Sequence, residues 1–256
     1  MSEDSAARFY DSLAADYHLI FPDWDASMSR QGASLDALIG ERVGEAPVSV
    51  LDCSCGIGTQ AIGLALRGHR VTGADVSPAS VSRAIREAEA RGVRLSAIVA
   101  DMRRLPFADA DFDVVVCADN AIPHLLSEED VVAALAGMRR VLRGGGLLAL
   151  SIRDYDAILR SRPTSTLPQL SQTPGGRTVT FQLWDWRDDG RRYDLEHFQV
   201  IPDGDARRVE VRRTAYWALT RRQLAGFAAE AGFVDVEWRM PDDSGFFQPL
   251  MAATAP

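Results

Sequence analysis

The chain has 256 residues, of which 46% are hydrophobic and 25% charged, and its formal net charge is −8. This length allows one large core with an insertion. No run of 18 apolar residues occurs, so we expect no membrane span, and the acidic balance argues against broad nucleic-acid binding. The N-terminus lacks the basic and apolar regions of a secretory signal, which favours a cytoplasmic location.

The first 44 residues are predicted to be helical. The spacing of apolar residues predicts one helix over 3–20 and a second over 26–40, with a break at Pro22. Ser27 is the expected N-cap of the second helix.

Short apolar segments alternate with helical ones over the next hundred residues. Strands are predicted over 48–52, 70–75, 95–100, 112–118 and 147–152, and helices over 59–67, 78–91 and 128–142. The near-continuous apolar run of 112–118 is typical of a parallel strand covered on both faces. The alternation predicts a doubly wound α/β sheet with right-handed crossovers.

The pattern changes after about residue 160. Residues 161–176 are rich in Ser, Thr, Pro and Gln and are predicted to be a loop. Three segments over 177–186, 191–201 and 207–219 then alternate in the manner of antiparallel strands. We therefore expect an inserted antiparallel β-meander over 161–219 that forms a substrate cap or an oligomer contact.

The remaining chain returns to the pattern of the core. A helix is predicted over 220–231 and strands over 233–238 and 246–253, which makes seven strands in a mostly parallel sheet. The expected organisation is a helical segment over 1–44, a core formed by 45–160 with 220–256, and the inserted meander.

A strand, a glycine turn and a helix follow one another from Val48 onward. Gly56 and Gly58 allow a ligand to approach the backbone where a Cβ would block it, and the helix start presents free N–H groups. Gly56-x-Gly58-x-x-Ala61 also fits a dinucleotide-binding loop, with Asp75 at a suitable distance. An NAD(P)-dependent oxidoreductase is therefore an alternative.

Carboxylates follow successive predicted strands, at the edge where doubly wound sheets bind ligands. Asp52, Asp75 and Asp101 can accept hydrogen bonds from an ammonium group, ribose hydroxyls and an adenine amino group, respectively. S-adenosylmethionine contains all three groups. Because dinucleotide loops usually have an apolar residue at the position of Asp52, this set favours a methyl donor.

The motif D-C-S-C-G-I-G-T at 52–59 resembles the first motif of class I S-adenosylmethionine-dependent methyltransferases, and the resemblance covers about 45–155. S-I-R-D-Y-D (151–156) and D-N-A-I-P-H-L (119–125) resemble stretches of glycine and sarcosine N-methyltransferases. Aminosugar N-methyltransferases share this architecture. The resemblance implies S-adenosylmethionine as cofactor and methyl transfer to a small molecule, most often to an amine nitrogen of an amino acid, aminosugar or secondary metabolite.

The resemblance also implies site residues. The N-terminal segment closes over the cofactor as a lid, Arg30 pairs with the cofactor's carboxylate and Arg153 with a carboxylate of the acceptor. The expected cofactor-binding residues are Arg30, Asp52, Cys53, Gly56, Gly58, Asp75, Val76, Asp101, Met102, Asp119 and Asn120. The expected substrate-binding residues are Arg153, Tyr10, Trp24 and Tyr155, and the expected catalytic residues are His124, Asn120 and Tyr17.

Among these, His124 is the best candidate for a proton acceptor, because its unperturbed pKa lies near neutrality. Arg153 has a structural alternative, an ion pair with Asp154 or Asp156. An aromatic hydroxyl that the family supplies after the fifth strand has no match in 157–180. We expect no metal site, since the Cys53-x-Cys55 pair has no further Cys or His nearby.

Other functions remain open at this point. A small-molecule O-methyltransferase should show a base or metal ligands in its pocket, and a binding protein could keep the fold without catalysis. Nucleic-acid methylation is disfavoured, because the D/N-P-P-Y/F loop is absent after the fourth strand. We expect a small-molecule substrate, no nucleic-acid or membrane partner, and a meander that can pair with a second copy of the chain.

Overall fold

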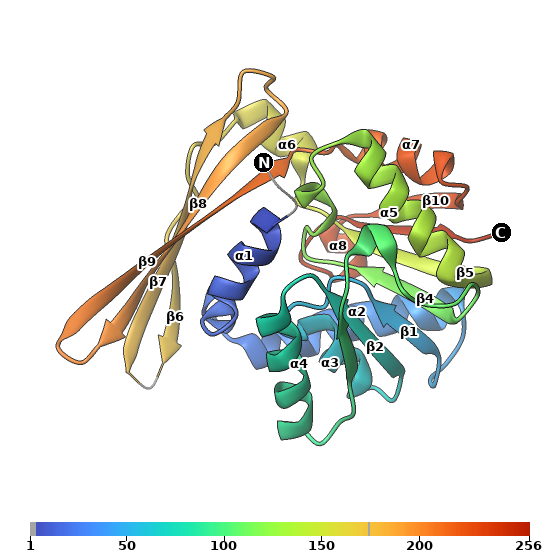
Figure 1. Cartoon of the computed structure of the whole chain (residues 1–256), viewed down its shortest axis with the longest axis horizontal. Helices are drawn as coiled ribbons and strands as arrows, with labels where there is room; N and C mark the ends of the chain where they lie inside the picture. The colour runs from blue at the N-terminus through green and yellow to red at the C-terminus, as the bar shows by residue number, and fades with distance from the viewer. Residues whose placement is uncertain (1–3, 174) are drawn as a thin grey trace.

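The computed structural model describes residues 4–173 and 175–256. It contains a seven-stranded sheet with the order β10-β11-β5-β4-β1-β2-β3 and a separate four-stranded sheet with the order β6-β7-β8-β9. Figure 1 shows the smaller sheet standing beside the larger α/β body, with α1 between them. Residue 3 of the predicted first helix lies outside the described residues.

The larger sheet confirms the prediction of a doubly wound, mostly parallel sheet. Neighbouring strands among β1 to β5 run parallel, and β11 runs antiparallel to both β5 and β10. The strands are β1 (Ser49–Asp52), β2 (Arg70–Asp75), β3 (Ser96–Val99), β4 (Phe112–Cys117), β5 (Leu142–Ser151), β10 (Val234–Arg239) and β11 (Leu250–Thr254). β5 begins earlier than predicted, since the N–H of Gly145 donates to the carbonyl of Ala255, directly after the neighbouring strand β11.

Helices cover both faces of this sheet, as the near-continuous burial of its central strands requires. On β4, Val114 and Val116 belong to the apolar cluster that includes α2 and α3, whereas Val115 belongs to the cluster that includes α5 and α7. The α-helices are α1 (Asp4–Leu13), α2 (Trp24–Arg42), α3 (Thr59–Ala65), α4 (Pro78–Ala90), α5 (Glu128–Val141), α6 (Tyr155–Ser161), α7 (Arg221–Glu230) and α8 (Pro241–Ser244). The short 3₁₀ helices are η1 (Tyr17–Ile20), η2 (Met102–Arg104) and η3 (Ile122–His124).

The N-terminal helices begin and end at different residues from those predicted. The first splits into α1 and η1 rather than running over 3–20, and α2 begins at Trp24. The N-cap of α2 is Asp23, whose carboxylate accepts the N–H of Ala26 at 2.9 Å, because its extended backbone points the side chain at the first turn. Ser27, the predicted cap, is buried inside the helix.

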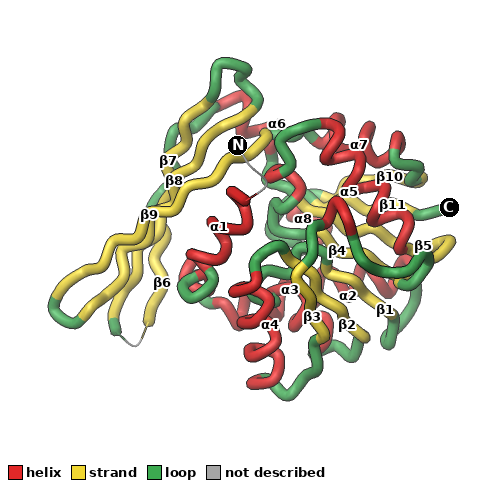
Figure 2. Tube along the Cα trace, viewed as in Figure 1, coloured by secondary structure: helices red, strands yellow, loops and turns green. Residues whose placement is uncertain are grey.

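The inserted meander forms the smaller sheet, with one strand more than predicted. Its strands are β6 (Gln169–Thr173), β7 (Gly176–Trp186), β8 (Arg192–Asp203) and β9 (Ala206–Trp217), and Figure 2 shows them as one long twisted ribbon. β6 lies in the segment 161–176 that we predicted to be a loop. Its polar residues gave no alternation signal, yet the strand pairs along its whole length with β7.

Candidate active site

Two cavities meet at the carboxyl ends of the central strands. The first has a volume of about 180 Å³ and is lined by the turn at 53–57, Asp75, Met102 and residues of α1 and η1. The second, of about 530 Å³, lies between the smaller sheet, η1 and the segment 245–248. Asp119, which follows β4, lines both. The topology therefore places the Asp119 carboxylate at the junction of the two cavities.

The glycine turn is fixed by Asp75. The N–H of Gly56 donates to Asp75 Oδ2 at 2.9 Å, and the N–H of Ser77 donates to Asp75 Oδ1 at 2.9 Å. Gly56 has φ +50°, and a Cβ there would lie 3.4 Å from Cε1 of Tyr17. Gly58 (φ +96°) begins α3 and lines neither cavity, so its contribution is to the backbone of the turn.

Asp52 lies behind this turn rather than in a cavity. It is 1% exposed and lines neither cavity, so its contact with a ligand's ammonium group stays a prediction. Oδ1 accepts the N–H of Ser54 at 3.3 Å, whereas Oδ2 has no partner among the described residues. Burial raises the pKa of Asp52 to about 7. An unpartnered carboxylate beside the first cavity favours a positively charged ligand there, and the ammonium and sulfonium groups of S-adenosylmethionine meet this condition.

The expected adenine end of the first cavity contains an ion-pair network that the sequence did not indicate. Arg103 donates through Nε to Asp101 at 3.0 Å and through Nη1 to Asp130 at 3.1 Å. Burial acts to raise the pKa of Asp101, but the bonds from Arg103 hold it below its usual value. Asp101 and Met102 line the cavity as predicted, and Val76 and Cys53 lie there with them. Both Asp101 oxygens already accept from Arg103, through its backbone N–H, Nε and Nη2, so a further donor would have to share these oxygens.

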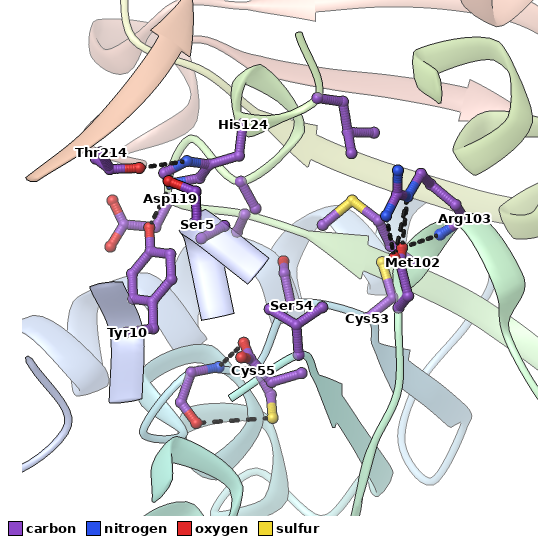
Figure 3. A pocket seen from close by; sticks show the side chains of 18 of the residues that line it. Ser5, Tyr10, Cys53, Ser54, Cys55, Met102, Arg103, Asp119, His124 and Thr214 are labelled. Carbon is purple, nitrogen blue, oxygen red and sulfur yellow. Dashed lines mark hydrogen bonds and ion pairs between the residues drawn. The ribbon is translucent and has the colours of Figure 1, made fainter. Parts of the chain in front are cut away.

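Tyr10 and Tyr17 come from α1 and η1 and form one wall of the first cavity. Figure 3 shows Tyr10 pointing at His124. The Tyr10 hydroxyl shares a hydrogen bond with His124 Nε2 at 2.8 Å, and Thr214 Oγ1 lies 3.3 Å from His124 Nδ1. Burial and the charge of Arg153 lower the pKa of His124 to about 3. Such a neutral imidazole is a poor proton acceptor for an amine, so the structure does not support the predicted role of His124.

Arg153 lines the second cavity and is held on several sides. Nη1 donates to Tyr193 Oη at 3.1 Å and Nη2 to Gln182 Oε1 at 3.2 Å. Its Cζ lies 5.1 Å from the ring centre of Trp184 and 5.2 Å from that of Tyr216. Arg153 is thus a fixed, partly buried guanidinium whose position favours an anionic ligand.

The structural alternative for Arg153 is wrong. Asp154 and Asp156 pair instead with Arg221, at 2.7 and 3.5 Å. Within 4–173 and 175–256, no carboxylate lies within ion-pair distance of Arg153. The cation therefore has room for a ligand's carboxylate.

Three predicted site residues line neither cavity and are held by hydrogen bonds within the protein. Asn120 donates from Nδ2 to Tyr155 Oη at 3.0 Å and accepts the N–H of Arg153 at Oδ1, so both ends of its amide are occupied. Tyr155 is completely buried, and its hydroxyl also bonds to that of Tyr193. Trp24 packs on α3, where Nε1 donates to Thr59 Oγ1 at 2.9 Å. None of the three lines a cavity.

The second cavity holds further residues. His197 on β8 is buried, and its Nε2 has no partner among the described residues. The strand register places Gln182 and Arg212 on either side of it, on the same inward face of the sheet. The sequence did not show which face of the sheet would be inward. Arg30 also lines this cavity and donates to Ser27 Oγ at 3.2 Å. Outside 157–180, Tyr193 bonds to Arg153 through its hydroxyl and the Tyr216 ring lies 5.2 Å from the Arg153 Cζ, but neither tyrosine lines a cavity.

Within 4–173 and 175–256, no group of three His, Cys, Asp or Glu side chains could hold a metal ion. No helix in the same part of the chain is long and apolar enough to span a membrane.

The chain is similar to known methyltransferases. A family model described as a methyltransferase domain matches residues 50–146. A glycine/sarcosine N-methyltransferase of Parasynechococcus marenigrum is 37% identical over 138 residues, which are 54% of this chain and 48% of that protein. A cypemycin N-terminal methyltransferase of a Streptomyces species is 32% identical over 176 residues, covering 68% and 64%. The chain spans about half the length of the first curated relatives that it matches.

Solved structures share the fold over nearly the whole chain. An amino pentose methyltransferase from Micromonospora echinaspora, solved with S-adenosylmethionine bound, superposes with a TM-score of 0.73 at 24% identity and covers 96% of this chain and 97% of that one. A sugar N-methyltransferase from a Streptoalloteichus species has a TM-score of 0.73 at 20% identity, with 89% and 87% covered. The methyltransferase-domain match, the curated relatives and this shared fold together support a class I S-adenosylmethionine-dependent methyltransferase.

Proposed function

We propose that this methyltransferase transfers a methyl group to an amine nitrogen of a small molecule that also carries an anionic group. The observation that carries the proposal is the junction at Asp119, where the cavity containing the glycine turn meets the cavity containing Arg153. Methyl transfer needs a donor and a nucleophile held in line, and positioning alone can supply much of the rate.

The first cavity suits the cofactor. Asp75 would accept from the ribose hydroxyls, Asp101 and Met102 would hold the adenine, and the turn at 53–57 would face the amino-acid end. When bound, S-adenosylmethionine supplies a methyl group on a sulfonium whose leaving group is a neutral thioether. Arg30 lines the second cavity, so its proposed pairing with the cofactor's carboxylate requires that end to lie at the junction.

The second cavity suits an amine acceptor with a carboxylate. Arg153 would bind the carboxylate, and Asp119 would face the amine. The names of several relatives specify N-methylation of an amino acid or of an N-terminus, or describe an aminosugar methyltransferase. O-methylation is less well supported, because ionising a hydroxyl needs a metal or a stronger base than an amine acceptor needs, and His124 has a lowered pKa.

The test is transfer of labelled methyl from S-adenosylmethionine to a panel of glycine, sarcosine, longer amino acids, aminosugars and a short peptide with a free N-terminus. We expect label in at least one primary or secondary amine, and none in the same acceptor after N-acetylation. Label found only in hydroxyl acceptors contradicts N-methylation. Binding of S-adenosylhomocysteine without transfer to any acceptor indicates a protein that has kept the fold but not the activity.

We also propose that the outer face of the smaller sheet pairs with a second copy of the chain. The register aligns Leu170, Val179, Val200 and Val209 in one row across β6 to β9, and Phe181, Phe198 and Val211 in the next. Val209 is 57% exposed. An apolar patch of this kind usually marks an interface. The following row carries Glu196 beside Arg213, and two copies related by a two-fold axis can exchange these charges.

Val209→Glu is expected to raise the dimer dissociation constant at least about tenfold, since it would bury an unpaired charge. The matched control is Val234→Glu, because Val234 is 44% exposed on the edge strand β10 of the other sheet. Sedimentation velocity measures both variants. A wild type that stays monomeric at about 50 µM, which corresponds to an association free energy weaker than about −6 kcal/mol, contradicts the dimer.

A further inference from the structure

Asp119 has a strained backbone, and hydrogen bonds hold the residue in place. Its φ is +56° and that of Asn120 is +67°, a left-handed conformation that costs free energy for residues other than glycine and often occurs at functional sites. The N–H of Asp119 donates to Ser151 Oγ at 2.9 Å, and Ser151 Oγ donates to Gln248 Oε1 at 2.9 Å. This turn directs the carboxylate to the junction of the two cavities.

Asp119 lines both cavities, and charged and phenolic side chains surround its carboxylate. Arg153 from the loop after β5 and Arg30 from α2 line the second cavity with it. Tyr10, Tyr17 and Tyr216, from α1, η1 and β9, also face it, and burial raises the pKa of each above its usual value. These phenols are therefore neutral at neutral pH.

Burial also raises the pKa of Asp119 to about 6, against the opposing charge of Arg153 and a hydrogen bond from Gln248 Nε2 at 3.4 Å. The carboxylate is thus ionised at pH 7 but is more basic than an exposed aspartate. An amine acceptor arrives mostly as its ammonium form at this pH, and that form has no lone pair for attack.

We propose that Asp119 is a catalytic residue that binds the acceptor's ammonium group in the second cavity and removes the proton that occupies its lone pair. This proposal rests on the proposed function above. The N–H bond breaks, and its proton passes to an Asp119 oxygen. The freed lone pair then forms the bond to the methyl carbon while the carbon–sulfur bond breaks and leaves its electron pair on sulfur. The product leaves as a methylammonium ion, and Asp119 returns its proton to water.

The test compares Asp119→Asn with the wild type between pH 6 and 9.5, using labelled methyl transfer to the best amine of the panel. Asn tolerates the left-handed backbone well, so the turn should be kept. We expect kcat/KM at pH 7 to fall by about 10²- to 10⁴-fold, as for loss of a general base. The loss of kcat/KM relative to the wild type should become smaller as the pH approaches the pKa of the free amine, because the variant then binds acceptor that is already deprotonated in solution. In the wild type, kcat/KM should fall as the pH drops through about 6.

Asp235→Asn is the matched control. Asp235 is also an aspartate with positive φ (+51°), but it is exposed on β10 and lines neither cavity. It should retain the wild-type pH profile. A loss in Asp119→Asn that is equal at every pH, or that an equal weakening of S-adenosylhomocysteine binding accounts for, overturns the proposal and leaves Asp119 as a positioning or cofactor residue. A wild type that binds S-adenosylhomocysteine but methylates no amine overturns the proposed function itself, and this role with it.

Discussion

Replacing Arg153 with methionine is expected to abolish most methyl transfer to a carboxylate-bearing amine. Truncating one partner of a buried charge pair costs about 2–5 kcal/mol, or roughly 30- to 5,000-fold in kcat/KM. Arg153 is fixed between Trp184 and Tyr216 and bonded to Tyr193, so the wild type pays little entropy to hold a ligand's carboxylate. Methionine keeps the length and the apolar contacts of the side chain. Labelled methyl transfer at subsaturating acceptor measures the change.

The acceptor itself provides the control for Arg153→Met. The methyl ester of the same amino acid lacks the anionic group, so the wild type and the variant should methylate it at similar low rates. S-adenosylhomocysteine affinity and the thermal unfolding midpoint report whether the cofactor site and the fold survive. If the variant loses the ester and the free acid equally, Arg153 acts through the structure of the cavity rather than through a bond to carboxylate.

Replacing Asp75 with asparagine is expected to weaken S-adenosylhomocysteine binding about 100-fold. Asp75 accepts the N–H groups of Gly56 and Ser77 with separate oxygens, and an asparagine amide would face one of these donors with its own N–H₂. An unpaired buried donor costs about 1–3 kcal/mol, and the proposed ribose bonds lose their charge assistance in addition. Isothermal titration calorimetry measures the dissociation constant.

Asp113→Asn is the matched control for Asp75→Asn. Asp113 also accepts a backbone N–H, from Ser49 at 2.8 Å, but it lies away from both cavities. It should alter stability without altering S-adenosylhomocysteine affinity. An Asp75→Asn variant that binds as tightly as the wild type would remove Asp75 from the cofactor site and leave it a structural residue of the turn.

The parts of the site that follow from local pattern were predictable from the sequence. Val48 to Gly58 combines a short apolar run with two glycines, and this combination specifies strand, turn and helix without help from distant residues. The carboxyl ends of parallel strands share one edge, so Asp75, Asp101 and Asp119 were brought together as expected.

The parts that depend on side-chain direction or on distant contacts were not predictable. Asp52 has a suitable position in the chain, but the turn covers it. Asn120 and Tyr155 lie within two residues of Asp119 and Arg153, which line the cavities. Their own side chains instead bond to each other. The second cavity exists because the inserted sheet packs beside the core, and His197 enters it only through the register of β8. Such pairings carry no local signal.

The most direct test is a crystal structure of the protein with S-adenosylhomocysteine and an amine that it methylates. The proposal predicts the adenosyl group in the first cavity beside Asp75 and Met102. It also predicts the acceptor in the second cavity, with its carboxylate on Arg153 and its nitrogen about 3 Å from Asp119. An acceptor whose nitrogen lies away from the junction, or a cofactor bound outside the first cavity, would contradict methyl transfer across Asp119.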